Sequence, residues 1–243
     1  MMIRIFVLAI ALFTFTAPAV QAEEFTDAQR AEMQKMFEEY LLENGETILN
    51  SVNNYQAEQE KKARAESEEK AKEFLSQVDN KNLPMTGNPE GDITIVEFFD
   101  YNCGYCRKAL EELQTVLKKD DKVKVLFMEM PILGPSSLEI AKWSLASHKQ
   151  GKYFEYHTAI FDHNGQKDEA ALEKIAKDVG LDIKQLKKDK DSAEIDAQIK
   201  DQVAQAQALN IRGTPGFIIN GQLYPGYMPA AQIKTIIEEA RSS

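Results

Sequence analysis

The pattern of hydrophobic and polar positions divides the chain into a short apolar leader, a charged helical segment and a longer mixed region. The leader, residues 1–22, has one early cation at Arg4, then an apolar run, and it ends with small residues at Val20 and Ala22. These features predict a secretory signal peptide that is cleaved after Ala22. A membrane anchor is the alternative, but the apolar run is shorter than the roughly 20 residues that cross a bilayer core.

Residues 23–80 are predicted to form an N-terminal helical arm with a linker. Thr26 and Gln29 fit a capping box, and Asn44 before Gly45 marks the expected end of the first helix. Apolar residues follow at three- and four-residue spacing on two helical stripes, which are Met33, Met36, Phe37, Tyr40 and Leu41, and then Ile48, Leu49, Val52 and Tyr55.

Two such stripes need burial, which a short helical hairpin cannot provide by itself. The pattern therefore favours self-association through residues 26–56. Residues 56–74 are nearly all charge and alanine, which predicts a solvated helix without a core of its own. A disordered or decorative leader is the alternative for residues 23–79 as a whole, because charge-rich segments often stay unfolded.

The remaining chain, residues 81–243, reads as a mixed α/β domain. Asn, Pro and Gly in residues 80–92 mark its boundary, and the Asn220-Gly221 pair predicts a β-hairpin. The expected elements are a buried strand at 93–99, a helix at 103–117, a second strand at 122–130, a helical region at about 135–209 and a final helix at 230–240. The strand–helix–strand unit predicts parallel strands. The sum is a central sheet flanked by helices, with an all-helical insertion between its halves.

Charge and cysteine content narrow the function. The chain has 29 Lys and Arg residues against 39 Asp and Glu, a net charge of −10, which argues against nucleic acid as a partner. Two cysteines are too few for a fold that is held together by several disulfide bonds.

Both cysteines, Cys103 and Cys106, lie three positions apart where a strand meets a helix. A sulfur at a helix start faces unpaired backbone N–H groups and the positive end of the helix dipole, which favours its thiolate. Cys103 is therefore the expected nucleophile, and Cys106 can attack any mixed disulfide formed there. Half of a zinc site and a structural disulfide are the alternatives, but the three histidines of the chain all lie in the predicted insertion.

Cys-x-x-Cys after a strand, with Gly213-Thr214-Pro215 far downstream and just before another strand, resembles the thioredoxin fold. This resemblance implies that Pro215 follows a cis peptide bond and that Thr214 and Pro215 face the cysteines. An ordinary turn proline is the alternative, because few X-Pro bonds are cis.

The stretch from Glu97 to Cys106 and the helical insertion further resemble the DsbA family of exported thiol-disulfide oxidoreductases. The resemblance implies that Glu97 is buried beneath Cys106 and exchanges its proton; an outward-facing strand glutamate is the alternative. The dipeptide between the cysteines is Gly104-Tyr105 where DsbA has Pro-His, and it is similar to the isomerase DsbC. A helical arm on such a domain is similar to the ScsC proteins, including their trimeric members.

These resemblances imply a periplasmic disulfide isomerase that acts on exported client proteins containing cysteines. Gly104, Tyr105, Thr214 and Pro215 would contact the client, and no cofactor is implied beyond the redox-active cysteine pair. A homo-oligomer is expected, a trimer by the ScsC analogy or a dimer, with a membrane thiol reductase of the DsbD or ScsB kind as partner. A dithiol oxidase or reductase of particular clients, and a copper-binding thiol protein, are the alternatives.

Aromatic residues near the pair are candidates for a client groove. Phe98, Phe99, Tyr101 and Tyr105 all lie within a few positions of Cys103. Because strand aromatics usually face a core, core packing is expected for the two phenylalanines, and also for Trp143 in the insertion.

Overall fold

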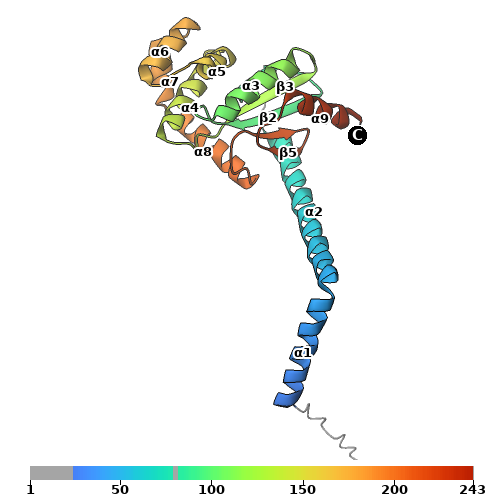
Figure 1. Cartoon of the computed structure of the whole chain (residues 1–243). Coiled ribbons are helices and arrows are strands. Elements are labelled where there is room, and N and C mark those ends of the chain that lie inside the picture. Colours follow the sequence, from blue (N-terminus) through green and yellow to red (C-terminus); the bar gives the residue numbers. More distant parts are fainter. Residues whose placement is uncertain (1–23, 79–81, 243) are drawn as a thin grey trace, which may run out of the picture. The chain divides into compact units, whose positions relative to one another are not determined.

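The computed structural model describes residues 24–78 and 82–242, and the chain divides into two compact units, residues 1–58 and 59–243 (Figure 1). The predicted leader at residues 1–22 and its cleavage site lie outside the described residues. Within the described ranges, none of the helices has the length and apolar character needed to cross a bilayer.

The N-terminal unit contains α1 (Asp27–Glu43) and the beginning of α2 (Gly45–Gln77). The predicted capping box is confirmed, because the Gln29 N–H donates to Thr26 Oγ1 at 3.3 Å and the Thr26 N–H donates to Gln29 Oε1 at 2.9 Å. None of the residues of α1 is buried. Its stripe residues Met36 and Phe37 are 61% and 67% exposed, so this apolar face is uncovered in the single chain.

The second unit is built on a five-stranded sheet of order β1-β3-β2-β4-β5. β2 (Ile93–Phe99) and β3 (Val123–Glu129) are parallel and joined by α3 (Gly104–Leu117), as the sequence predicts. β4 (Gly216–Ile219) and β5 (Gln222–Pro225) form the predicted hairpin around Asn220-Gly221. β1 (Met85–Gly87) was not predicted; the segment taken only as a boundary supplies an edge strand antiparallel to β3.

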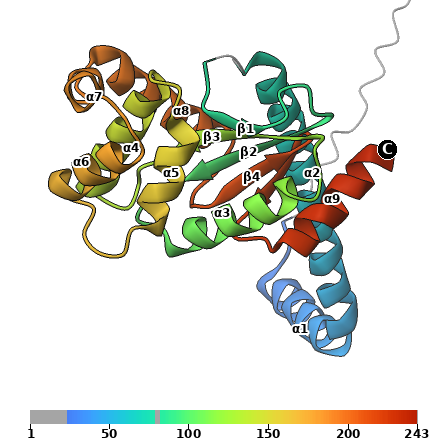
Figure 2. The ribbon, with the colours of Figure 1, turned by 90° about the horizontal axis from the view of Figure 1, so that it is seen from above.

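Each face of the sheet is covered by its own set of helices (Figure 2). The alternation of β2 sends Ile93, Ile95 and Phe99 into a large core with α3, α9 (Ala230–Ser242) and the helical insertion. Val96 and Phe98 point to the opposite face, where a smaller core forms with residues of α2 and the end of α8. Glu97 has the same parity as Ile95 and Phe99, so its side chain faces α3.

The C-terminal part of α2 belongs to the domain, which corrects the expected boundary at residue 81. Ala71 is fully buried, and Phe74, Leu75 and Val78 pack against the smaller core, with the Phe74 and Phe98 ring centroids 6.0 Å apart. The compact unit therefore begins at Gln59, inside the charged segment that was expected to be a solvated helix without a core.

The predicted all-helical insertion is confirmed and consists of α4 (Pro135–His148), α5 (Tyr153–Asp162), α6 (Glu169–Asp178), α7 (Ile183–Lys190) and α8 (Ala193–Ala208). Trp143 of α4 is fully buried, as expected. Asp168, Asp182 and Ser192 each cap the N-terminus of the helix that follows, which explains why the sequence breaks its helices at these positions.

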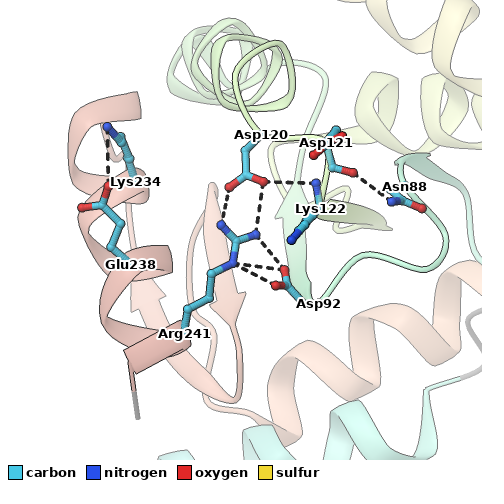
Figure 3. Close-up of polar contacts among 8 residues, drawn as sticks. All are labelled: Asn88, Asp92, Asp120, Asp121, Lys122, Lys234, Glu238 and Arg241. Atoms are coloured by element: carbon cyan, nitrogen blue, oxygen red, sulfur yellow. Dashed lines mark hydrogen bonds and ion pairs between the residues drawn. The ribbon is translucent and has the colours of Figure 1, made fainter.

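Arg241 attaches the last helix, α9, to one end of the sheet (Figure 3). This end is the one away from the N-terminus of α3. The guanidinium of Arg241 donates to Asp92, just before β2, and to Asp120, between α3 and β3, with shortest N–O distances of 2.7 Å to each. These contacts raise the pKa of Arg241 and lower the pKa of both carboxyls. The Arg241 guanidinium thus joins α9 to the segments that contain Asp92 and Asp120, which are distant from it in the sequence.

Candidate active site

Cys103 occupies the N-cap position of α3, with an extended backbone at φ −84° and ψ 114°. Its N–H donates to the carbonyl of Asp100 at 3.0 Å, and its carbonyl accepts from the N–H groups of Cys106 and Arg107. The side chain is 9% exposed, and its Sγ donates to the carbonyl oxygen of Thr214 at 3.3 Å. The sulfur therefore lies at the positive end of a helix and beside a second loop.

Cys106 lies one helical turn further along and is fully buried. Burial raises the pKa of its thiol well above the ordinary value, and the charge of Glu97 adds to the shift, while the Asp100 N–H opposes it. Both cysteines are free thiols. The two cysteines are thus unequal, since Cys103 keeps a small exposed fraction of 9%, whereas Cys106 has none and its thiol stays protonated.

Glu97 is buried in the middle of β2, with Phe127 of β3 and Phe217 of β4 as its neighbours in register. Burial raises the pKa of this carboxyl to about 8, and the charge of Cys103 contributes to the shift. Among the described residues, no partner donates to its Oε2 atom. The expected burial of Glu97 is confirmed, and its proton affinity suits exchange near neutral pH.

The loop that faces the nucleophile contains the predicted cis peptide bond, which joins Thr214 to Pro215. The loop leads directly into β4 at Gly216, where an added Cβ would lie 2.9 Å from Ile211. Pro215 accepts a hydrogen bond from the Gly226 N–H at 2.8 Å, which anchors the loop to the residue after β5. The structure therefore brings the Thr214 carbonyl, at the cis peptide bond, to Cys103.

The dipeptide between the cysteines is open to solvent. An added Cβ on Gly104 would meet nothing within 4 Å, so packing does not demand glycine there. Tyr105 is 60% exposed. The other aromatic candidates do not line a surface groove, because Phe98 and Phe99 are in the cores and Tyr101 is only 2% exposed.

Asp100, which sequence reasoning did not single out, organises the turn before Cys103. Its buried carboxylate accepts from the N–H groups of Asn102, Ile132 and Leu133 and from Ser137 Oγ, at 2.8 to 2.9 Å. The turn before the cysteines is thereby fixed to the loop before α4. An Asp two positions before an Asn at a strand end is a local turn signal that pointed to this role.

A second unexpected group is the buried carboxyl of Glu129 at the end of β3. The carboxyl accepts from the Tyr153 hydroxyl at 3.1 Å. The backbone N–H of Glu129 donates to Gln202 Oε1 at 2.7 Å. Burial raises the pKa of Glu129 well above its ordinary value. Nothing in the sequence marks it, because a glutamate at a strand end is ordinarily solvated.

The histidines of the insertion are not grouped as metal ligands. His157 is buried, its pKa is lowered to about 3 by that burial, and its Nδ1 lies 2.7 Å from the Tyr101 hydroxyl. Within residues 24–78 and 82–242, no three His, Cys, Asp or Glu side chains gather in an arrangement that can hold a metal ion.

Known proteins share this fold. A family model described as thioredoxin matches residues 79–239. A thioredoxin-like oxidoreductase from Silicibacter pomeroyi DSS-3 is 42% identical, with a TM-score of 0.65 and coverage of 67% of this chain and 94% of that one. The chain belongs to the thioredoxin family. Its fold is that of the thiol-disulfide oxidoreductases.

Two further thioredoxin-fold structures are similar to this chain. The thiol-disulfide exchange protein alpha-DsbA2 from Wolbachia pipientis is 26% identical over 72% of this chain and 96% of that one, with a TM-score of 0.68. A linker-deletion variant of Proteus mirabilis ScsC is 20% identical and has the same TM-score of 0.68. That match covers 91% of this chain and 99% of the ScsC chain, and at this identity it shows a shared fold.

The curated relatives that match this chain are much longer. The Na⁺/H⁺ antiporter NhaA 1 of Mycobacterium sp. (strain KMS) is 26% identical over 171 residues, which is 68% of this chain and 28% of the antiporter. The chain thus spans about a quarter of the length of these relatives.

Proposed function

We propose that this thiol-disulfide oxidoreductase is a periplasmic disulfide isomerase that reshuffles non-native disulfides through Cys103. The contact between Cys103 Sγ and the Thr214 carbonyl carries the proposal, because it puts the sulfur at the start of α3 beside a loop that can hold a client backbone. Thr214 and Pro215 would pair with an extended client segment, while Gly104 and Tyr105 would contact its side chains.

The proposed reaction is a sequence of thiol-disulfide exchanges without net oxidation. The Cys103 thiolate attacks one sulfur of a client disulfide, the S–S bond breaks, and the other client sulfur leaves as a thiolate. A second client thiolate then attacks the mixed disulfide and releases Cys103. When no client thiol attacks, Cys106 loses its proton and displaces the client thiol, which leaves the client reduced and the pair oxidised.

Glu97 would serve the last of these steps. Burial raises the pKa of its carboxyl to about 8, and the charge of Glu97 contributes to the raised pKa of the Cys106 thiol. The ionised carboxylate would accept the proton of Cys106 as this sulfur attacks the mixed disulfide, and the carboxylic acid would return it on reduction.

The N-terminal unit supports self-association. Its stripe residues Phe37, Tyr40, Leu41, Leu49 and Tyr55 are more than half exposed in the single chain. Isolated helices with uncovered apolar faces are stabilised mainly by packing. Several active sites held near one client would raise the local concentration of attacking thiols. A trimer is favoured by the ScsC analogy, and a dimer is the alternative.

Location and partners follow from the same proposal. The residue pattern of 1–22 supports export to the periplasm and cleavage after Ala22. Clients would be exported proteins with cysteines, and no cofactor beyond the cysteine pair is required. An isomerase needs its pair reduced, so a membrane thiol reductase of the DsbD or ScsB kind would supply electrons.

The test is reactivation of a disulfide-scrambled enzyme by the mature chain. Ile48→Glu with Val52→Glu puts two charges on the second stripe, while Asn50→Glu with Asn54→Glu puts the same charges on the other face of that helix. We expect the first pair to reduce the oligomer mass and the reactivation, and the control pair to leave both unchanged. Light scattering and recovered activity give the two readouts.

The Cys103→Ser variant tests whether reactivation uses the Cys103 sulfur. Reactivation that persists without this sulfur would contradict the proposal. If the wild-type chain reactivates no scrambled enzyme but oxidises or reduces dithiol clients, it is an oxidase or reductase. Stoichiometric copper binding without either activity would identify a copper-binding thiol protein.

A further inference from the structure

Two tyrosines form an aromatic pair beside the nucleophile. Tyr105, two residues after Cys103, is 60% exposed, and Tyr227, in the loop after β5, is partly buried. Their ring centroids are 6.1 Å apart and the ring planes are inclined by 42°. This spacing is within the range of interacting aromatic side chains.

Tyr227 is held in place by Glu112 of α3. The phenol donates to Glu112 Oε1 at 2.6 Å, and Glu112 Oε2 accepts from the N–H of Ala230, the first residue of α9, at 2.8 Å. Met228, which follows Tyr227 in the chain, is buried. The ring of Tyr227 is thus fixed before any client arrives, which lowers the entropic cost of binding against it.

The pair is adjacent to the loop that faces Cys103. Gly226 donates its N–H to the carbonyl of Pro215, and Tyr227 follows it directly in the chain. Gly226 has φ +83°, a backbone angle that favours glycine, so the turn that presents Tyr227 is specified by the sequence. Cys103 contacts Thr214 of the cis-proline loop, and Tyr105 follows Cys103 by two residues, so both tyrosines belong to segments that adjoin the nucleophile or its facing loop.

We propose that the Tyr105–Tyr227 pair is a specificity site that binds an aromatic or large aliphatic side chain next to the client's cysteine. An extended client segment paired with Thr214 would project neighbouring side chains sideways, toward the rings. Lys108 lies with its Nζ 5.5 Å from the Tyr105 ring centroid, so a cationic client residue would be repelled there. This inference rests on the proposed role of Cys103 as the nucleophile.

A peptide series tests the inference independently of isomerase activity. The peptides are identical except for Phe, Leu, Ser or Lys after a single cysteine, which is capped as a mixed disulfide with thionitrobenzoate. Cys103 attacks the peptide sulfur and releases coloured thionitrobenzoate, and Cys106 then releases the peptide thiol. We expect the wild-type rate constant to be about tenfold higher for Phe and Leu than for Ser, and lowest for Lys.

Variants separate recognition from structure. Tyr227→Ala should remove the preference for Phe and Leu, and Tyr227→Phe, which keeps the ring but loses the Glu112 hydrogen bond, should retain part of it. The matched control is Phe25→Ala, which removes an aromatic side chain that is 58% exposed in the N-terminal unit, and it should change nothing. Hydroxyethyl disulfide, a small disulfide without an aromatic or large aliphatic group, reports the reactivity of Cys103 itself in each variant.

Equal wild-type rates for all peptides would overturn the inference. So would a Tyr227→Ala variant that slows the small disulfide as much as the Phe peptide, because the pair would then only support the fold. A peptide preference together with failed reactivation of scrambled enzyme would uphold the pair and reject the isomerase. No reaction at Cys103 would reject both.

Discussion

The Sγ atom of Cys103 donates a hydrogen bond to the carbonyl oxygen of Thr214 at 3.3 Å, although 111 positions separate the two residues. The sheet explains this proximity. β2 pairs antiparallel with β4, and Phe98 lies opposite Gly216, so the ends of the two strands that lead to Cys103 and Thr214 are side by side. The register of two buried strands therefore sets the position of the nucleophile against the loop that faces it.

Glu97→Gln tests the buried carboxyl through the pH dependence of stability. The pKa of Glu97 rises from 4.5 to about 8 on folding, so the folded state holds this proton more tightly than the unfolded state. The stabilising contribution is complete below pH 4.5 and is lost as pH rises through 8. Linkage limits the change to roughly 5 kcal/mol. Glutamine stays neutral, so the variant should gain stability relative to wild type across this window.

The measurement is urea unfolding of the reduced chains at about pH 5 and about pH 8. Glu173→Gln, at a surface position that pairs with Lys187, serves as the control. Unfolding free energies of wild type and Glu97→Gln that change in parallel with pH would show that Glu97 does not titrate in this range.

Asp100→Asn should disturb the turn before the cysteines. The amide can still accept from Asn102 and Ser137, but an NH₂ group would face the N–H groups of Ile132 and Leu133. Unsatisfied buried donors predict a loss of about 2 to 4 kcal/mol in unfolding free energy. Chemical denaturation measures the loss, and alkylation of Cys103 should become faster as its turn loosens.

The exposed carboxyl of Asp178 gives a matched control, because it forms only a surface pair with Lys174. Equal stability of Asp100→Asn and Asp178→Asn would show that the four hydrogen bonds at Asp100 do not hold the turn.

Much of the central fold could be predicted because its signals are local. The apolar run of β2, the Asn220-Gly221 turn and the cap at Thr26 each act within a few residues. β1 could not be predicted, since its three residues follow a proline, end in a glycine and have no strand pattern, and they are ordered by pairing with β3. The two cysteines, Glu97 and the cis-proline loop could be placed together because the family resemblance supplied the long-range contact.

The packing of the C-terminal part of α2 against the domain was not predicted, although the sequence contains a pattern that indicates it. The spacing of a buried helical face is present at Ala71, Phe74, Leu75 and Val78. This apolar stripe is short and the residues around it are charged, so the segment was expected to be a solvated helix. Asp100 and Glu129 were missed for a different reason. Whether a carboxyl at a strand end is solvated or buried depends on the helices packed around it, which lie far away in the sequence.

Arg241→Ala should loosen the attachment of α9. The variant loses bidentate contacts that join α9 to the segments before β2 and after α3 (Figure 3). We expect the midpoint of thermal unfolding to fall by a few degrees. The difference should shrink in about 1 M salt, because the charges are near the surface.

Lys234→Ala on the same helix is the matched control. Lys234 pairs with Glu238, at 3.5 Å on an exposed face, and such a pair contributes little. If Lys234→Ala lowers the unfolding midpoint as much as Arg241→Ala does, the contacts to Asp92 and Asp120 have no special role.

Ala71→Glu tests whether the C-terminal part of α2 is a structural part of the catalytic domain. The Ala71 side chain is fully buried in the core that contains Val96 and Phe98, so glutamate would bury an unpaired charge there. A loss of about 3 to 5 kcal/mol in unfolding free energy is expected. Ala65→Glu adds the same group at an exposed position of α2 and should be nearly neutral. Limited proteolysis should cut residues 59–77 faster in Ala71→Glu than in Ala65→Glu. Equal stability and equal cleavage would mean that α2 only rests on the domain, and the domain would then begin near residue 81.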